Sequence, residues 1–319
     1  MDSILIAGGA GFIGSHLCKK LLSQGYSVIC IDNLITGSKS NIVPLLENPH
    51  FIFIEQDIRQ PLRLGARVSR IDAIFHLASP ASPNKKSPRS YINFPIETLM
   101  TNSLGTYNLL QLVTDKTVKF LYASTSEVYG NPSVSPQPES YWGNVNPNGI
   151  RSVYDEGKRF GEALTFGYYR KFGINARIVR IFNTFGPFMQ KDDGRVVTTF
   201  IQQALTNTNI TIFGKGDQTR SFCYVDDMVE GLMKAMFTPK TEGQVINLGN
   251  PDERKISEIA TMIKTMAGSL SEIVYEPMPE DDPSMRKPDI AKAKQLLQWE
   301  PTVSLEEGLK KTLSYFMSA

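Results

Sequence analysis

The sequence predicts an α/β protein built on a doubly wound parallel sheet with a smaller C-terminal lobe. Two observations support this fold class. Strand-like apolar runs alternate with helical patterns through the first 180 residues, an order typical of consecutive βαβ units. The first run, "ILIA", leads into a glycine-rich turn and then an amphipathic helix, as in the opening unit of such sheets. Beyond about residue 185 the pattern loosens into shorter segments that proline and glycine punctuate.

The alternating segments can be taken in chain order. The predicted strands are "SILIAG", "SVICID", "FIFIEQD", "AIFHLAS", "KFLYAST" and "ARIVRIFN". Helical periodicity marks residues 12–24, 95–114 and 153–172 between them, and residues 196–206, 225–237 and 256–267 after them. In a parallel sheet, ligand-binding groups gather at the carboxyl ends of the strands. The residues at such ends are Asp32, Asp57, Ala78 and Ser124.

The change of pattern divides the chain into two predicted parts. Residues 1–185 form a Rossmann domain, and residues 186–319 form the smaller lobe that covers the sheet edge. The strand-like "QVINLGN" at 244–250 is a candidate to return to the first domain, so the parts are expected to be partly interleaved. The loop "SPASPNKKSPRSY" at 79–91 follows a strand end, and it is either an active-site loop or a solvated connection.

The overall composition excludes several classes of protein. With 319 residues, of which 41% are apolar and 21% charged, the chain can bury a large core. A formal charge of +2 gives no general field for nucleic acid or an anionic membrane, so a small-molecule ligand is expected. No basic leader precedes the first strand, and no apolar run reaches the roughly 18 residues of a membrane span. A cytoplasmic location is therefore expected.

The cysteines and histidines predict neither a disulfide nor a metal site. Three cysteines cannot all pair, and two lie in segments predicted to be buried, so we expect reduced thiols at Cys18, Cys30 and Cys223. The three histidines lie far apart and have no cysteine or carboxylate neighbours at ligand spacing. No metal is expected.

The glycine spacing after the first strand fits a dinucleotide-binding turn. Gly9-x-Gly11-x-x-Gly14 matches the general fingerprint, and Gly8-x-x-Gly11-x-x-Gly14 matches a variant of it. The early glycines let backbone N–H groups approach a pyrophosphate at the helix N-terminus. Asp32 ends the next strand, where a carboxylate accepts the adenosine ribose hydroxyls and repels a 2′-phosphate. The predicted cofactor is NAD, and the plainer alternative is that the glycines serve only a tight turn.

Tyr154 and Lys158, in "YDEGK", stand four apart on a predicted helix and so share a face. A phenol is a poor base at neutral pH, but an adjacent ammonium and the positive ring of oxidised nicotinamide would lower its pKa. Such a pair can remove a hydroxyl proton as hydride leaves for NAD. The strand end "ASTSEVYG" at 123–130 should face the same crevice, where Glu127 could hold or relay a proton. The plainer interpretations are a surface pair and a turn-capping hydroxyl cluster.

These motifs carry a family resemblance over essentially the whole chain. "GGAGFIGSHL", the Tyr-x-x-x-Lys pair and "RIFNTFGP" resemble the extended short-chain dehydrogenase/reductase family that modifies nucleotide sugars. A second set is similar to the UDP-glucuronic acid decarboxylases, which make UDP-xylose: "HLASPASP", "STSEVYG", "YWGNVNP", "RSVYDEGKR", "DDGRVV", "QTRSFCYVDDMV" and "DDPSMRKPDI". The smaller lobe is then expected to bind the nucleotide sugar.

The resemblance implies site residues position by position. For the cofactor they are Gly8, Gly11, Phe12 and Ile13 at the pyrophosphate, Asp32 and Asn33 at the ribose, Asp57 and Ile58 at the adenine, and Leu77 and Ser79 along a strand end. For catalysis they are Tyr154 as the base, Lys158 as its partner, Thr125, Ser126 and Glu127 facing the substrate, and Arg286 near the sugar. For the nucleotide sugar they are Asn183, Arg195, Phe213 stacked on the uracil, and Arg220 at the diphosphate.

The resemblance also implies a closed redox cycle. Oxidation at C4 makes a 4-keto sugar whose C5 carboxylate is β to a carbonyl, and such an acid loses carbon dioxide readily through an enolate. Reprotonation of C5 and return of the hydride to C4 restore NAD. Tyr154 fits proton exchange at O4, Thr125 or Ser126 fits polarisation of the ketone, and Glu127 and Arg286 fit control of the carboxylate and of C5. The alternatives are a 4-epimerase or 4,6-dehydratase on the same scaffold, and a non-catalytic NAD-binding scaffold.

Two further features concern the substrate and the assembly. Compared with the family pattern, the loop at 79–91 is longer, and Met100 stands where a lysine is usual. This removes a cation from the neighbourhood of the sugar carboxylate, and Lys85, Lys86 or Arg89 could replace it unless the substrate differs. The resemblance implies a homodimer through residues 95–114 and 153–172. Six apolar residues are compatible with that interface and equally with the core: Leu104, Leu109, Leu112, Phe160, Leu164 and Tyr168.

Overall fold

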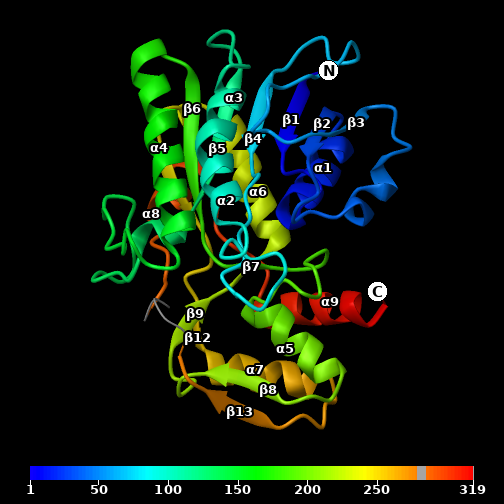
Figure 1. Ribbon diagram of the computed structural model, residues 1–319, viewed down its shortest axis with the longest axis vertical. Coiled ribbons are helices and arrows are strands. Elements are labelled where there is room, and N and C mark those ends of the chain that lie inside the picture. Colours follow the sequence, from blue (N-terminus) through cyan, green and yellow to red (C-terminus); the bar gives the residue numbers. More distant parts are fainter. Residues whose placement is uncertain (279–284, 319) are drawn as a thin grey trace.

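A seven-stranded sheet forms the centre of the larger lobe in the computed structural model, which describes residues 1–278 and 285–318 (Figure 1). Its strands are β1 (Ser3–Ala7), β2 (Ser27–Asp32), β3 (Phe51–Glu55), β4 (Ala73–His76), β5 (Lys119–Thr125), β6 (Asn175–Ile181) and β11 (Val245–Leu248). In the order β11-β6-β5-β4-β1-β2-β3, every neighbouring pair is parallel. The predicted doubly wound α/β fold is confirmed. The strand order reverses between β1 and β4, where such sheets open a ligand crevice.

The chain returns to this sheet after it has entered the smaller lobe. Residues Val245–Leu248 of β11 pair in register with Ile178–Ile181 of β6. The sheet therefore contains residues from both sides of position 185. The division of the chain into two domains at that position stays a prediction.

Helices cover both faces of the sheet (Figure 1). α1 (Phe12–Ser23) and α6 (Val225–Phe237) pack on one face, and α2 (Pro95–Met100), α3 (Thr106–Leu110) and α4 (Ser152–Phe172) pack on the other. Successive strand residues alternate between the two faces. Ile6 accordingly packs in the cluster that contains Leu17 of α1, whereas Leu5 packs in the cluster that contains Leu109 of α3. Burial on both faces explains why these strands are continuous apolar runs.

The helix predicted over 95–114 is interrupted. α2 gives way to a π-helical stretch, Thr101–Gly105, before α3 begins. Asn102 in this stretch is fully buried; its Nδ2 donates to Ser79 Oγ at 2.9 Å, and its Oδ1 accepts from the Tyr122 hydroxyl at 3.0 Å. The widened turn accommodates a polar side chain between the helix and the sheet, which apolar periodicity does not reveal.

The smaller lobe contains α5 (Val196–Leu205), α7 (Ile256–Met266) and α9 (Leu305–Ser318) (Figure 1). Three strand pairs accompany them: β8 (Ile210–Phe213) with β13 (Ile273–Glu276), β9 (Thr219–Ser221) with β12 (Glu253–Lys255), and β7 (Thr184–Phe185) with β10 (Cys223–Tyr224). Of the helices after residue 185, α5, α6 and α7 were predicted, whereas α8 (Ala291–Leu297) and α9 were not. The signal for α9 was present, because Leu305, Leu309, Leu313 and Phe316 recur at helical spacing and are all buried.

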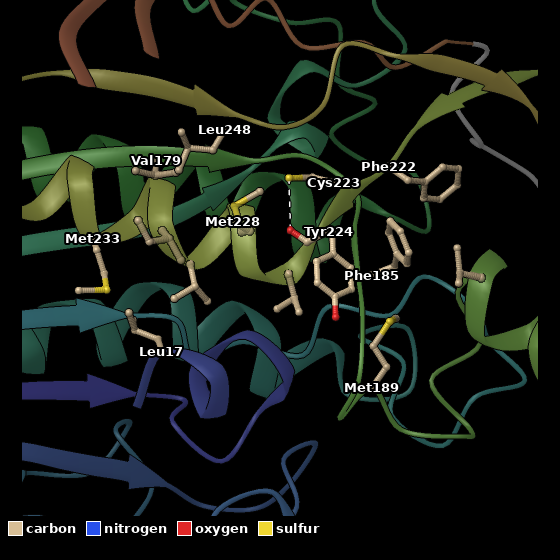
Figure 2. Packing of buried hydrophobic residues seen from close by; sticks show 14 of the residues in the cluster. Leu17, Val179, Phe185, Met189, Phe222, Cys223, Tyr224, Met228, Met233 and Leu248 are labelled. Carbon is tan, nitrogen blue, oxygen red and sulfur yellow. Dashed lines mark hydrogen bonds between the residues drawn. The ribbon is translucent and has the colours of Figure 1, made fainter. Parts of the chain in front are cut away.

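One apolar core continues from the sheet into the smaller lobe. Figure 2 shows Val179 and Leu248 of the sheet beside Met228 of α6, and Phe185 and Phe222 farther toward the smaller lobe. The two lobes therefore share a packed interior rather than a hinge of loops.

The three cysteines in this core are buried and free. No helix in the described part of the chain is both long and apolar enough to cross a membrane.

Candidate active site

A cavity of about 940 Å³ opens where the sheet order reverses and extends into the smaller lobe. The predicted site residues that line it are Gly8, Gly11, Phe12, Ile13, Leu77, Ser79, Thr125, Ser126, Glu127, Tyr154, Lys158, Asn183, Arg195, Phe213, Arg220 and Arg286. Those that lie outside its lining are Asp32, Asn33, Asp57 and Ile58. The structure thus brings the predicted pyrophosphate, catalytic and nucleotide-sugar residues into one space.

The glycine turn has the shape of a cradle for an anion. Gly8 has φ +85°, and a Cβ there would lie 2.7 Å from the backbone N of Ala78. A Cβ on Gly14 would lie 2.1 Å from the carbonyl oxygen of Gly8. Gly11 precedes α1 and offers no side-chain cap, so the first N–H groups of the helix face the cavity without a side-chain partner from that residue. These residues fit the pyrophosphate of a dinucleotide.

Asp32 supports the same turn from the end of β2. Its Oδ2 accepts the N–H of Ala10 at 3.0 Å, and its Oδ1 accepts the N–H of Leu34 at 2.8 Å. Burial raises the pKa of Asp32, and these two hydrogen bonds oppose that rise. The carboxylate therefore fixes the turn to β2, and its role at a ribose stays a prediction.

The other residues implied for the adenosine end lie close to Asp32 in the fold. Asp57 forms an ion pair with Arg59, with Nη2 and Oδ2 2.6 Å apart, and accepts from Asn33 Nδ2 at 3.2 Å. Burial raises the pKa of Asp57, but the hydrogen bonds with Arg59 and Asn33 outweigh it, and the pKa is lower than usual. Ile58 is buried in the core beneath α3.

Tyr154 and Lys158 lie on the first turns of α4 and are both buried. Lys158 Nζ donates to the carbonyl of Ala123 at 2.8 Å and lies 5.8 Å from the centre of the Tyr154 ring. Burial lowers the pKa of Lys158 to about 7. Burial also raises the pKa of Tyr154, and this outweighs the lowering effect of its hydrogen bond with Thr125. The residues around Tyr154 thus raise the pKa of its phenol, whereas the sequence predicted a lower value. A cation beside the phenol would lower this pKa.

Glu127 is bound by two arginines from distant parts of the chain. It lies in a short 3₁₀ turn, Ser126–Tyr129, where the Thr125 side chain accepts its N–H at 3.2 Å. Its carboxylate pairs with Arg151 through one oxygen and with Arg286 through the other. Burial raises the pKa of Glu127, but the two guanidinium charges lower it to about 2. Glu127 is therefore ionised at neutral pH.

Arg151 is a site residue that the sequence reasoning missed. It lines the cavity and immediately precedes α4. A signal was available, because Arg151 stands one helical turn before Tyr154 in "RSVYDEGK" and so shares its side of the helix. In the sequence its nearest carboxylate at helical spacing is Asp155, so nothing there indicated that its partner would be Glu127, 24 positions earlier.

The smaller lobe contributes two arginines and an aromatic ring. Arg195 precedes α5, and its Nη2 lies 2.8 Å from Asp193 Oδ2, which holds the guanidinium in one orientation. Arg220 on β9 is buried and donates to the carbonyl of Thr219 at 2.8 Å. Phe213 ends β8 and also lines the cavity. The two planar guanidinium groups suit a diphosphate, and the aromatic ring suits stacking against a base.

The loop at 79–91 is part of the cavity wall and not a solvated connection. Asn84 Nδ2 donates to the carbonyl of Gly194 at 3.2 Å, and Ser87 Oγ donates to the carbonyl of Asp192 at 2.5 Å. Arg89 already has protein partners, because its Nε donates to Asp192 Oδ1 at 2.7 Å and its Nη1 donates to the carbonyl of Thr36 at 3.0 Å. Lys85 and Lys86 line the cavity from exposed positions. Of the three cations expected in this loop, these two face the cavity without a fixed ion pair among the described residues.

Met100 does not lie near the cavity, where the family resemblance places it. It is exposed on α2 and is not part of the cavity lining. Its neighbours Thr98 and Asn102 take the inward positions of this helical segment. Met100 was expected to remove a cation from beside the sugar carboxylate. Because position 100 faces the surface, this expectation is wrong.

A glycine cradle, a buried tyrosine–lysine pair and a second lobe that closes one cavity together define the class of protein. A family model described as the NAD dependent epimerase/dehydratase family matches residues 4–249, and the chain belongs to this family. Its cofactor is NAD.

Individual proteins are similar to the chain over almost its full length. The chain is 49% identical over 313 residues to UDP-glucuronic acid decarboxylase 1 of Xenopus tropicalis, covering 98% of this chain and 72% of that protein. It is 51% identical over 307 residues to UDP-glucuronic acid decarboxylase 5 of Arabidopsis thaliana, covering 96% and 86%. A solved structure of UDP-glucuronic acid 4-epimerase from Bacillus cereus, in complex with UDP-glucuronic acid and NAD, matches with a TM-score of 0.87 and 33% identity over 99% of both chains.

The position of Asp32 predicts cofactor choice. NAD should bind at least about tenfold more tightly than NADP, because a 2′-phosphate would meet a carboxylate at the end of β2. Titration of both cofactors measures this, and the Asp32→Asn variant should narrow the difference. Asp72→Asn is the control, since Asp72 accepts the N–H of Ser3 at the opposite end of β1. Equal affinities of the wild type for the two cofactors would refute the role of Asp32.

Proposed function

We propose that the protein decarboxylates UDP-glucuronate to UDP-xylose through a 4-keto intermediate and restores NAD in each cycle. The observation that carries this proposal is the buried cluster of Glu127, Arg151 and Arg286 in the same cavity as Tyr154. The relatives at 49% and 51% identity, which are named UDP-glucuronic acid decarboxylases, support the substrate and the product. A 4-epimerase on this scaffold is the alternative, and it would leave the carboxylate in place.

The first step takes place at C4 of the sugar. Tyr154 takes the proton of the C4 hydroxyl. Lys158, whose pKa burial lowers to about 7, lies near the Tyr154 ring, and its protonated form stabilises the phenolate. The glycine turn with Gly8 and Gly11 would hold NAD, which when bound would supply a reversible acceptor for the hydride of C4. Thr125, which hydrogen-bonds with Tyr154, also polarises the ketone that forms. The proton of O4 returns from Tyr154 when C4 is reduced again.

The second step takes place at C5. The bond from C5 to the carboxylate carbon breaks, its electron pair moves toward the 4-keto oxygen as an enolate, and carbon dioxide leaves. Arg286 suits the carboxylate, because it lines the cavity, is only 3% exposed, and its Nε has no hydrogen-bond partner among the described residues. Glu127 is ionised, so it holds the two arginines in place and does not store the proton for C5. That proton then comes from a group in exchange with solvent.

We also propose that two copies of the chain pair in the cytoplasm through the α2–α3 segment and α4. Exposed apolar side chains gather on these adjacent helices, at Ile96, Met100, Leu104, Tyr107 and Phe160. Leu109 is fully buried in the core, which is the other of the two roles that the sequence left open for it. A second copy that presents the same face would cover this surface by twofold symmetry. The buried, free cysteines fit a reducing compartment.

Incubation with UDP-glucuronate tests the function directly. Mass spectrometry should show a nucleotide sugar that has lost carbon dioxide, without added NADH. Tyr154→Phe should keep its fold and its NAD but lose about 10²–10⁴-fold in turnover, because only the phenolic proton path is removed. A product of unchanged mass would contradict decarboxylation, and a Tyr154→Phe variant with more than about a tenth of wild-type activity would exclude Tyr154 as the base.

Glu127→Gln separates decarboxylation from oxidation. The amide keeps the size of the side chain, but it removes the negative charge with which the buried guanidinium groups of Arg151 and Arg286 both pair. Product formation should fall by about 10²-fold or more while NADH and a 4-keto sugar accumulate, as single-turnover absorbance at the NADH band would show. Asp227→Asn is the control, because Asp227 is a buried carboxylate outside the cavity that accepts from Thr302 and Val303. A Glu127→Gln enzyme that is less stable but turns over almost normally would reduce Glu127 to a structural role.

The proposed pairing is tested by solution mass. Sedimentation should give about twice the chain mass of 35.6 kDa for the wild type and a single chain for Phe160→Glu. Val43→Glu is the control, since Val43 is exposed on another part of the larger lobe. A wild type that sediments as one chain at micromolar concentration would contradict the dimer.

A further inference from the structure

We propose that Tyr91, at the end of the loop 79–91, is a positioning residue that holds the ring of Tyr154 in its reactive orientation. The inference rests on the proposed function, in which Tyr154 exchanges the proton at O4. The family resemblance assigned no role to Tyr91, and Tyr91 does not line the cavity itself.

The two rings form a parallel stack. Their centroids are 4.8 Å apart and their planes differ by 3°. Both side chains are buried, and Tyr91 is only 1% exposed. An offset stack of this kind restricts how far a ring can tilt or shift. Tyr91 therefore constrains the plane in which the Tyr154 hydroxyl can point.

The backbone fixes Tyr91 at the base of the loop. Its N–H donates to the carbonyl of Ser82 at 3.0 Å, and Ser90 Oγ donates to the same carbonyl at 3.0 Å. The hydroxyl of Ser82 in turn donates to the carbonyl of Asp193, whose side chain holds Arg195. The ring behind Tyr154 is thus attached to the segment that carries a predicted nucleotide-sugar contact. This links the placement of the base to the wall of the substrate pocket.

The ring of Tyr91, and not its hydroxyl, accounts for this placement. The hydroxyl is buried and has no hydrogen-bond partner among the described residues. The ring also covers one face of Tyr154. The other groups around Tyr154 are Thr125 at the end of β5, Glu127 in the turn that follows, Asp155 and Lys158 on α4, and Arg195 before α5. Removing the ring would let water reach the phenol and would allow it to tilt. A small misplacement of a reacting group is enough to cost about 10²-fold in rate.

Two variants test the assignment. Tyr91→Leu removes the stack and should lower kcat at least about tenfold, while KM and the content of bound NAD change by less than about twofold. The acid limb of its kcat profile should move to lower pH, because burial is the main cause that raises the pKa of Tyr154 and water now reaches it. Tyr91→Phe keeps the stack and should retain kcat within about twofold. Tyr91→Met, which fills the space without a ring, replaces the leucine variant if that one does not fold.

The control is Phe75→Leu, which removes an equally buried ring from β4 outside the cavity and should lower Tm without changing kcat or the pH profile. Wild-type turnover of UDP-glucuronate is measured first, and its absence would mean that the proposed function fails. With an active wild type, normal kcat and pH profile in Tyr91→Leu would overturn the role of Tyr91 alone. Equal losses in Tyr91→Leu and Tyr91→Phe would also overturn it, because the hydroxyl would then be responsible.

Discussion

The ion pairs of Glu127 with Arg151 and Arg286 are the interaction on which the active site depends. Glu127 follows the central strand β5, Arg151 precedes α4, and Arg286 comes from the segment before α8. A buried charge without its partner costs several kcal/mol, so these ion pairs help to hold the three segments together. The cluster thereby joins the sheet, the catalytic helix and the C-terminal part of the chain around one cavity. The charge that stabilises this arrangement is also the charge that can meet a sugar carboxylate.

The residues proposed for the cofactor and for the sugar line one cavity, because the sheet and the smaller lobe approach each other at the reversal of strand order. The glycine turn and the Tyr154–Lys158 pair come from the larger lobe, and Arg195, Phe213 and Arg220 come from the smaller one. The loop at 79–91 connects the two lobes, since it follows β4 and hydrogen-bonds to residues 192–194. A cycle in which hydride leaves C4 and later returns to it needs such a closed arrangement, because the intermediate must stay bound throughout.

Local patterns in the sequence were sufficient for the central sheet and for part of the candidate site. The strands and the glycine turn are specified by neighbouring residues, and the Tyr154–Lys158 pair by helical spacing. The π-helical stretch was not predictable, because Asn102 contacts Ser79 and Tyr122 only in the folded chain. The pairing of Glu127 with Arg286 spans 159 positions, and no periodicity records it. Family resemblance supplied Arg286 but placed position 100 beside the sugar, where the helix directs it to the surface.

The proposed closed redox cycle determines which hydrogen atoms of the product come from solvent. The enzyme would convert UDP-glucuronate in D₂O, and NMR and mass spectrometry would locate deuterium in the product. A hydride that leaves C4 and returns to it, with C5 reprotonated from solvent, predicts UDP-xylose with one deuterium at C5 and none at C4. Deuterium at C4, a pentose without deuterium, or a product that keeps its carboxylate would contradict the account.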